Sequence, residues 1–179
     1  MRFLAFLSVL VFSVFMVPQA HADITQAKNF QKFDANILTS GQPSQKVLEG
    51  LGTDDVEVVI NLVRSSEGVY NPKEGEILQS NGIEYIHNPV SWSSPKDAQL
   101  QNFLDVMKRH EGKKILVHCR SNARASAFVA VYRANENPAA KAAKMQELKR
   151  FWKRNVGIDL DRNKTWLAFL QKHVGTQVN

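Results

Sequence analysis

The segment VHCRSNARAS, residues 117–126, holds the side chains of this sequence that are best suited to chemistry. Cys119 is the only cysteine, and Arg124 follows it five positions later. The apolar residues before Cys119 predict a β-strand and those after Arg124 predict a helix, so the loop between them enters a helix N-terminus. Backbone N–H groups and the helix dipole favour an anion at such a turn, including a thiolate. We therefore predict that Cys119 is a nucleophile and that Arg124 holds an oxyanion over the sulfur.

The other residues of this loop fit an anion-binding role. Asn122 lies in mid-loop, where a left-handed backbone is expected, and asparagine tolerates that conformation better than most residues. Ser121 and Ser126 are candidates to donate hydrogen bonds to the thiolate or the anion, although loop serines commonly act as caps or turn formers. The predicted oxyanion-binding loop comprises Arg120, Ser121, Asn122, Ala123, Ala125 and Ser126. The alternative for a lone cysteine is a small buried hydrophobe.

His118 precedes the cysteine on the predicted strand. Successive strand residues point to opposite faces, so the His118 side chain is expected to point away from Cys119. We predict that it orders the loop from behind and does not act as the general base. One cysteine with one adjacent histidine lacks the usual spacing of metal ligands, so no metal and no cofactor are predicted.

Polar residues also follow a second predicted strand, VEVVINLV at residues 56–63. Asn61, Arg64 and Glu67 lie at or beyond its carboxyl end, where parallel sheets bind ligands, and they are predicted to line the rim of the same site. The alternative is a surface loop with a local ion pair. Gln42 in SGQPS is a weaker rim candidate, since a turn glutamine beside proline is usually structural.

The elements that carry these residues alternate between strand-like and helix-like segments. That order predicts a single-domain α/β fold with a mainly parallel central sheet flanked by helices. Apolar strands are expected at residues 56–63, 83–90 and 113–119. The helix before the last of these is expected to begin with Ser94 as its cap, Pro95 at its first position and Asp97 near the third.

The N-terminus predicts export. A basic start, an apolar stretch and the sequence Ala20-His21-Ala22 make residues 1–22 a secretory signal peptide, cleaved after Ala22, with an uncleaved anchor as the alternative. The mature protein, residues 23–179, is expected in the periplasm or secreted, without a stable membrane span. The net charge of +6 suits a small anionic substrate. The basic run in residues 141–154 is typical of a solvated helix face. Nucleic acid is not predicted as a partner, because the protein is expected to be exported and this run has no interleaved aromatic residues beyond Phe151 and Trp152.

The motif ILVHCRSNARASAF resembles the signature loop of cysteine-based protein phosphatases, which has His-Cys, a short loop and then Arg. ILTSGQPS, VEVVINLVRSSEG and IEYIHNPV are similar to segments of one bacterial branch, the phosphatase-like domain of the beta-lactamase-hydrolase-like protein family. The resemblance spans roughly residues 33–134. It implies a phosphatase-like domain over residues 23–179 that hydrolyses phosphate monoesters through a phosphocysteine.

Two departures from the usual phosphatase pattern leave alternatives open. Only four residues separate Cys119 from Arg124, and CRSNAR also resembles the loop of rhodanese-type sulfurtransferases, which carry a persulfide taken from a sulfane-sulfur donor such as thiosulfate. In NPVSWSSPKD, Ser91 or Trp92 stands where a phosphatase carries its acidic aspartate. Protonation of the leaving group by a general acid is worth about 10²–10⁴ in the rate of phosphate ester cleavage. Sulfur transfer from thiosulfate expels sulfite, which needs no proton. A third alternative is a non-catalytic oxyanion-binding domain.

Overall fold

The computed structural model describes residues 23–174, so the predicted signal peptide lies outside the described residues. A five-stranded sheet of order β1-β2-β5-β3-β4 forms the centre of the molecule. Its strands are β1 (Gln31–Lys32), β2 (Ile37–Ser40), β3 (Val58–Asn61), β4 (Glu84–His87) and β5 (Ile115–His118). Strands β2 to β5 are parallel, and β1 adds an antiparallel edge. The predicted single-domain α/β fold with a mainly parallel sheet is therefore confirmed.

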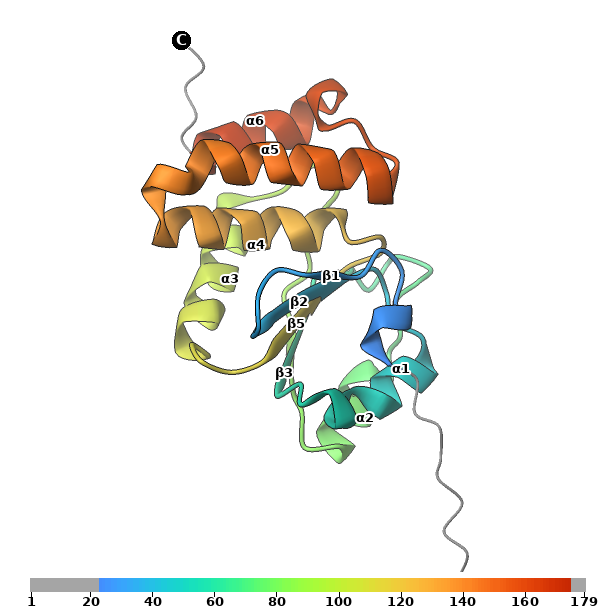
Figure 1. Cartoon of the computed structure of the whole chain (residues 1–179). Coiled ribbons are helices and arrows are strands. Elements are labelled where there is room, and N and C mark those ends of the chain that lie inside the picture. Colours follow the sequence, from blue (N-terminus) through green and yellow to red (C-terminus); the bar gives the residue numbers. More distant parts are fainter. Residues whose placement is uncertain (1–22, 175–179) are drawn as a thin grey trace, which may run out of the picture.

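Helices cover both faces of this sheet (Figure 1). One face carries α1 (Gln45–Gly50) and α2 (Glu74–Ser80), and the other carries α3 (Asp97–Arg109), α4 (Ala123–Glu136), α5 (Lys141–Phe151) and α6 (Lys164–Val174). Short 3₁₀ turns at Ile24–Gln26, Leu51–Asp54, Pro138–Ala140 and Leu160–Arg162 and a π-helical turn at Trp152–Val156 complete the helical elements. Within residues 23–174, no helix has the length and apolar character that a membrane crossing requires.

Strand β5 divides its side chains between two apolar cores. Ile115 and Val117 pack into the core beneath α3–α6, whereas Leu116 packs into the core beneath α1 and α2. Because successive strand residues alternate, His118 continues on the α1–α2 side, and Cys119 packs with the core of the α3–α6 side. The predicted opposition of these two side chains is therefore built into the strand.

Helix α3 begins later than the sequence indicates. The helix starts at Asp97 with Lys96 as its N-cap, so the prediction of Ser94 as the cap and Pro95 as the first residue is wrong. The Gln99 side chain explains the shift, because its oxygen accepts from the Lys96 N–H (2.9 Å) while its amide donates to the carbonyl of Pro89 (2.8 Å). This one amide ties the first turn to the incoming segment and fixes where the helix begins.

Candidate active site

Cys119 lies directly after β5, at the base of the loop that enters α4. Its side chain is buried, at 1 % exposed, and its N–H donates to the carbonyl of Ser40 (3.2 Å). The backbone turns at Asn122, which has φ of +70° and precedes the first residue of α4. A left-handed residue at this mid-loop position is predicted from the sequence, and the structure confirms it.

The segment before β1 forms hydrogen bonds with this loop. The Asn122 amide donates to the carbonyl of Asn29 (2.6 Å) and to the hydroxyl of Thr39 (2.9 Å). Asn29 in turn donates to the carbonyl of Ser121 (2.9 Å), and Gly41 forms an isolated bridge with the same residue. The loop conformation is therefore set by contacts with distant segments, and no sequence pattern indicates the part that Asn29 plays.

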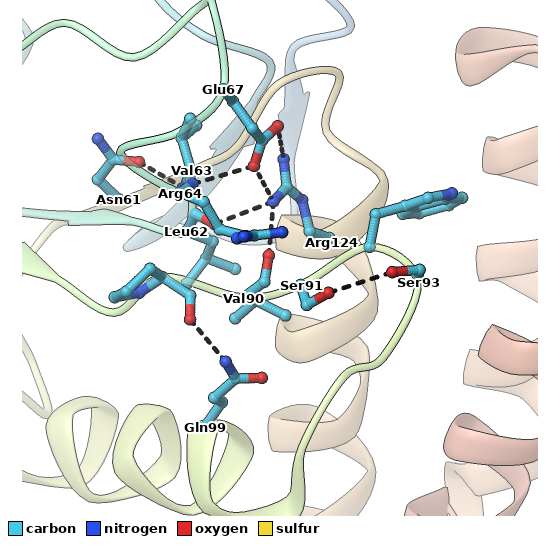
Figure 2. Close-up of polar contacts among 12 residues, drawn as sticks. Asn61, Leu62, Val63, Arg64, Glu67, Val90, Ser91, Ser93, Gln99 and Arg124 are labelled. Atoms are coloured by element: carbon cyan, nitrogen blue, oxygen red, sulfur yellow. Dashed lines mark hydrogen bonds and ion pairs between the residues drawn. The ribbon is translucent and has the colours of Figure 1, made fainter.

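Arg124, in the first turn of α4, is fixed by a carboxylate and two carbonyl groups (Figure 2). Its Nη1 and Nη2 donate to the two carboxylate oxygens of Glu67 (2.7 and 2.8 Å). Nη1 also donates to the carbonyls of Val90 (2.6 Å) and Leu62 (3.2 Å). Within residues 23–174, Nη1 and Nη2 make all of these contacts, and Nε makes none of them.

The Arg124–Glu67 pair is ionised on both sides. Burial alone would lower the pKa of Arg124, but the hydrogen bonds to Glu67 and the nearby Cys119 raise that pKa above its ordinary value. Burial would likewise raise the pKa of Glu67, but Arg124, the N–H of Arg64 (3.0 Å) and the charge of Arg120 lower it. Glu67 therefore acts as an acceptor that orients the arginine and holds no proton to donate at neutral pH.

A pocket of about 290 Å³ opens over this pair. Its lining joins the loop to the segments after β3 and β4 and to the chain before α6, and consists of Glu67, Trp92, Arg120, Ser121, Ala123, Arg124 and Ile158. Arg120 and Ser121 belong to the connection between β5 and α4, Ala123 and Arg124 are the first two residues of α4, and Glu67 belongs to the predicted rim. Ile158 was not predicted at all, and Trp92 was singled out only as a residue standing where an acid was expected.

The segment between β4 and α3 brings no acid to this pocket. Ser91 bonds to the hydroxyl of Ser93 (3.4 Å), and Asp97 is exposed and paired with Lys172 (2.5 Å) and His173 (2.8 Å) of α6. These two contacts hold the pKa of Asp97 below its ordinary value, as the arginine bonds do for Glu67. Among the described residues, Glu67 is the carboxylate that lines the pocket.

A second carboxylate, Glu74 of α2, lies fully buried on the opposite face of the sheet. It accepts from His118 Nε2 (2.5 Å), Gln42 Nε2 (2.8 Å) and Asn61 Nδ2 (3.2 Å), and the Asn61 amide also donates to the hydroxyl of Tyr85 (3.1 Å). Burial would raise the pKa of Glu74, but the charge and hydrogen bond of His118, together with Gln42, lower it.

This cluster corrects the predicted rim. Asn61 and Gln42 do not line the pocket, because Asn61 shares the α1–α2 face with Val59 and Gln42 bonds into that same buried cluster. His118 lies where the sequence placed it, behind the loop and away from Cys119. Glu74 was missed, since an acid in the first turn of a helix is the ordinary choice there and provides no other signal.

Five further predicted residues lie outside the pocket lining: Cys119, Asn122, Ala125, Ser126 and Arg64. The Ser126 hydroxyl donates to the carbonyl of Asn122 (2.6 Å) and accepts from Trp152 Nε1 (3.0 Å), so it is not placed to donate to the thiolate. It lies four residues into the helix, where a serine hydroxyl readily bonds back to the carbonyl of the preceding turn. Ala125 is buried, and Arg64 contributes its backbone N–H to Glu67. Residues 23–174 contain no group of three or more His, Cys, Asp or Glu placed to hold a metal.

Several solved structures resemble this chain. A candidate phosphatase (DUF442) from Shewanella putrefaciens CN-32 is 29% identical, with a TM-score of 0.71 over 86% of this chain and 92% of the other. Tk-PTP in its active form is 21% identical, with a TM-score of 0.66 over 83% and 97% of the two chains. The catalytic domain of the PP-IP phosphatase SIW14 from S. cerevisiae is 18% identical, with a TM-score of 0.63 over 84% and 85%. The last two show the fold alone.

The sequence itself matches one family model. The matched family is described as a DSP-PTPase phosphatase fused to NAD+ kinase, and the match covers residues 12–162. No curated protein matches the sequence. The expected membership of the cysteine-based phosphatases is confirmed, while the narrower resemblance to the beta-lactamase-hydrolase-like proteins stays a prediction. The match includes the Cys119–Arg124 loop and most of the chain, and the chain therefore belongs to this DSP-PTPase phosphatase family.

Proposed function

We propose that this protein is a cysteine-dependent phosphatase that hydrolyses phosphate monoesters through a phosphocysteine. In the first step the Cys119 thiolate forms a bond to phosphorus, and the bond from phosphorus to the ester oxygen breaks with its electron pair on the oxygen. In the second step water attacks the phosphocysteine, which returns the thiolate and releases inorganic phosphate. Neither step needs a metal or a cofactor.

One observation carries this proposal: Arg124 is fixed beside Cys119 through its Nη1 and Nη2 atoms. Glu67 and the carbonyls of Leu62 and Val90 accept hydrogen bonds from Nη1, and Glu67 also accepts one from Nη2. None of these three residues accepts a hydrogen bond from Nε. A guanidinium held in this way needs little reorganisation when charge moves onto the phosphoryl oxygens, which is the condition for electrostatic catalysis. The N-terminus of α4 adds its dipole at the same place.

The sulfurtransferase alternative gains no support from the comparisons. The matched family is a phosphatase family, and the structure from Shewanella putrefaciens that is 29% identical is described as a candidate phosphatase. A non-catalytic oxyanion-binding domain would share the same arginine and helix terminus, so turnover is the measurement that distinguishes it from an enzyme.

The test is the fate of the phosphoryl group. The reduced protein is mixed with an equimolar activated aryl phosphate and quenched in acid, and its intact mass is measured. We expect a fraction of the protein to gain one phosphoryl group, with none in Cys119→Ser. Arg124→Lys should turn over far more slowly, whereas Arg109→Lys, an exposed arginine at the end of α3, should behave as wild type. Binding of inorganic phosphate without any turnover would leave the binding domain as the better explanation.

We also propose that the protein acts outside the cytoplasm after removal of residues 1–22. The basic start, the apolar stretch and Ala20-His21-Ala22 support this proposal. N-terminal sequencing of the protein from a periplasmic fraction should begin at Asp23. A chain recovered from the cytoplasm with Met1 intact would contradict export.

A further inference from the structure

The segment that precedes β1 contacts the loop that enters α4 through a single residue, Asn29. Its side-chain amide donates to the carbonyl of Ser121 (2.9 Å), and its own carbonyl accepts from the side-chain amide of Asn122 (2.6 Å). The two hydrogen bonds run in opposite directions between Asn29 and two consecutive residues of the loop. Asn29 is therefore joined to the middle of the loop although it lies 93 positions earlier in the sequence.

Asn29 and Asn122 both have a left-handed backbone, with φ of +51° and +70°. Asparagine adopts this conformation more readily than other residues with a side chain, but such a residue persists only where its surroundings fix it. Each of the two is fixed by the other here, because the side chain of Asn122 reaches the carbonyl of Asn29 and the side chain of Asn29 reaches the carbonyl that precedes Asn122. The turn of the loop thus depends on a residue outside it.

Gly41, in the motif SGQPS, leaves the room that this contact needs. Its N–H donates to the carbonyl of Lys28 (2.6 Å), and it forms an isolated bridge with Ser121. A β-carbon at this position would lie 3.0 Å from the Cβ and the carbonyl oxygen of Lys28, and 3.1 Å from the carbonyl oxygen of Arg120. Backbone on both sides cannot move aside as a flexible side chain could. Glycine therefore allows the three segments to pack closely.

The segment that carries Asn29 is itself anchored in the core beneath α1 and α2. Ile24 and Ala27 are buried there, with exposed fractions of 4 % and 6 %. The N–H of Ile24 donates to the carboxylate of Asp54 (3.1 Å). Buried apolar side chains and a hydrogen bond to a distant residue hold the segment in place, so Asn29 meets the loop from a fixed support.

We propose that Asn29 is a positioning residue for the oxyanion-binding loop and acts through Ser121 and Asn122. Its effect on turnover rests on the proposed phosphatase function, whereas its effect on anion binding does not. Ser121 lines the pocket, and Arg124 follows Asn122 by two residues, so a turn that relaxes at Asn122 displaces both from a bound anion. A displacement of about 1 Å at a catalytic group can lower a rate about a hundredfold.

The first experiment removes the amide donor of Asn29. Asn29→Gly keeps the left-handed backbone, and Asn29→Asp keeps the shape but places an acceptor against the Ser121 carbonyl. We expect both to lower kcat for 4-nitrophenyl phosphate about tenfold or more. Titration calorimetry should show inorganic phosphate bound about two- to tenfold more weakly, from the usual net strength of one hydrogen bond.

Asp55→Gly is the matched control for these variants. Asp55 also has a left-handed backbone, with φ of +57°, and it is an exposed residue at the end of the Leu51–Asp54 turn. This variant should keep the kcat and the phosphate affinity of wild type. A melting curve is recorded for each variant, because a merely structural role of Asn29 would lower the melting temperature and leave kcat and phosphate affinity unchanged. That result would overturn the inference.

Binding to Cys119→Ser protein separates this inference from the proposed function. Calorimetry with inorganic phosphate is run on Cys119→Ser with and without Asn29→Gly. If wild type turns nothing over but phosphate affinity still depends on Asn29, the phosphatase proposal fails and the positioning role stands. If wild type neither turns over nor binds phosphate, both proposals fail.

Gly41→Ala tests the same contact from the other side. The added methyl group presses on Lys28 and Arg120 while the Asn29 side chain stays intact, so phosphate affinity should fall as it does in Asn29→Gly. This variant decides the question should the Asn29 variants fail to fold. An unchanged phosphate affinity in Gly41→Ala would show that the loop holds its shape without this contact, and the inference would be wrong.

Discussion

Replacing Glu74 should destabilise this protein more than replacing Glu76, the other acid of α2. Glu74 is fully buried and accepts from three donors, His118, Gln42 and Asn61, which come from the ends of the three strands that bear the site. Removing Glu74 leaves these buried donors without their acceptor, and each unsatisfied buried donor costs about 1–3 kcal/mol, so the total is about 3 kcal/mol or more. We expect a loss of that size for Glu74→Leu. Glu74→Gln retains one acceptor oxygen and should lose roughly 1–3 kcal/mol.

The effect should depend on pH in a known direction. The pKa of Glu74 is lowered in the folded protein from an ordinary value of 4.5. A carboxyl with a depressed folded pKa contributes stability above its unfolded pKa and loses it as the pH falls through the folded value. The difference between wild type and Glu74→Gln should therefore be largest near neutral pH and shrink once the pH falls below 4.5.

Urea unfolding followed by circular dichroism measures both effects. The midpoint should fall in Glu74→Gln while the slope with urea stays constant, which marks a change of stability without a change of the unfolded state. Glu76→Gln is the matched control, since Glu76 lies in the first turn of the same helix and is exposed. If the two variants lose equal stability, or if the loss at Glu74 is the same at neutral pH and below pH 4.5, the argument for a buried carboxylate is refuted.

Three other substitutions test the loop and its supports. Glu67→Gln should lower kcat/KM by roughly tenfold or more and should also lower the melting temperature, because the buried Arg124 loses its charged partner and its orientation; steady-state kinetics and a melting curve measure the two effects. Asn122→Ala should lose more stability in urea than Asn122→Gly by about 1–2 kcal/mol, because alanine at φ of +70° is strained and glycine is not. Trp166→Phe removes the donor to the Trp92 carbonyl, and a loss of about 1–3 kcal/mol in the free energy of unfolding, measured in urea, should follow.

The loop that enters α4 could be predicted because its residues are close together in the sequence. Cys119, Arg124 and the turn at Asn122 lie within one strand-to-helix connection, where residue order fixes the geometry. The pocket wall was not predictable in this way. Trp92 and Ile158 meet the loop only after α3, α5 and α6 have packed, and a tryptophan in a loop looks no different in sequence from one in the core.

The position of Asn61 behind the sheet could have been predicted by comparing neighbouring strands. Asn61 and His118 are directly paired in neighbouring parallel strands, so both side chains point to the same face of the sheet. The alternation that places His118 behind the loop therefore places Asn61 there too, and not at the rim. Glu74 could not be predicted in this way, because nothing in its own segment shows that α2 buries this residue.

A carboxylate lies on each face of the sheet near the loop, and each accepts hydrogen bonds from a nitrogen of the site: Glu67 from Arg124 and Glu74 from His118. Glu67 holds Arg124 in front and Glu74 holds His118 behind, with the pKa of each carboxyl lowered by its partner. These contacts fix the geometry of the anion site, because Glu67 orients Arg124 and Glu74 holds the end of the strand that precedes Cys119. They also mean that neither acid is free to protonate a leaving group. If the site is a phosphatase site, as proposed, its leaving group must therefore take its proton from water or depart as an anion.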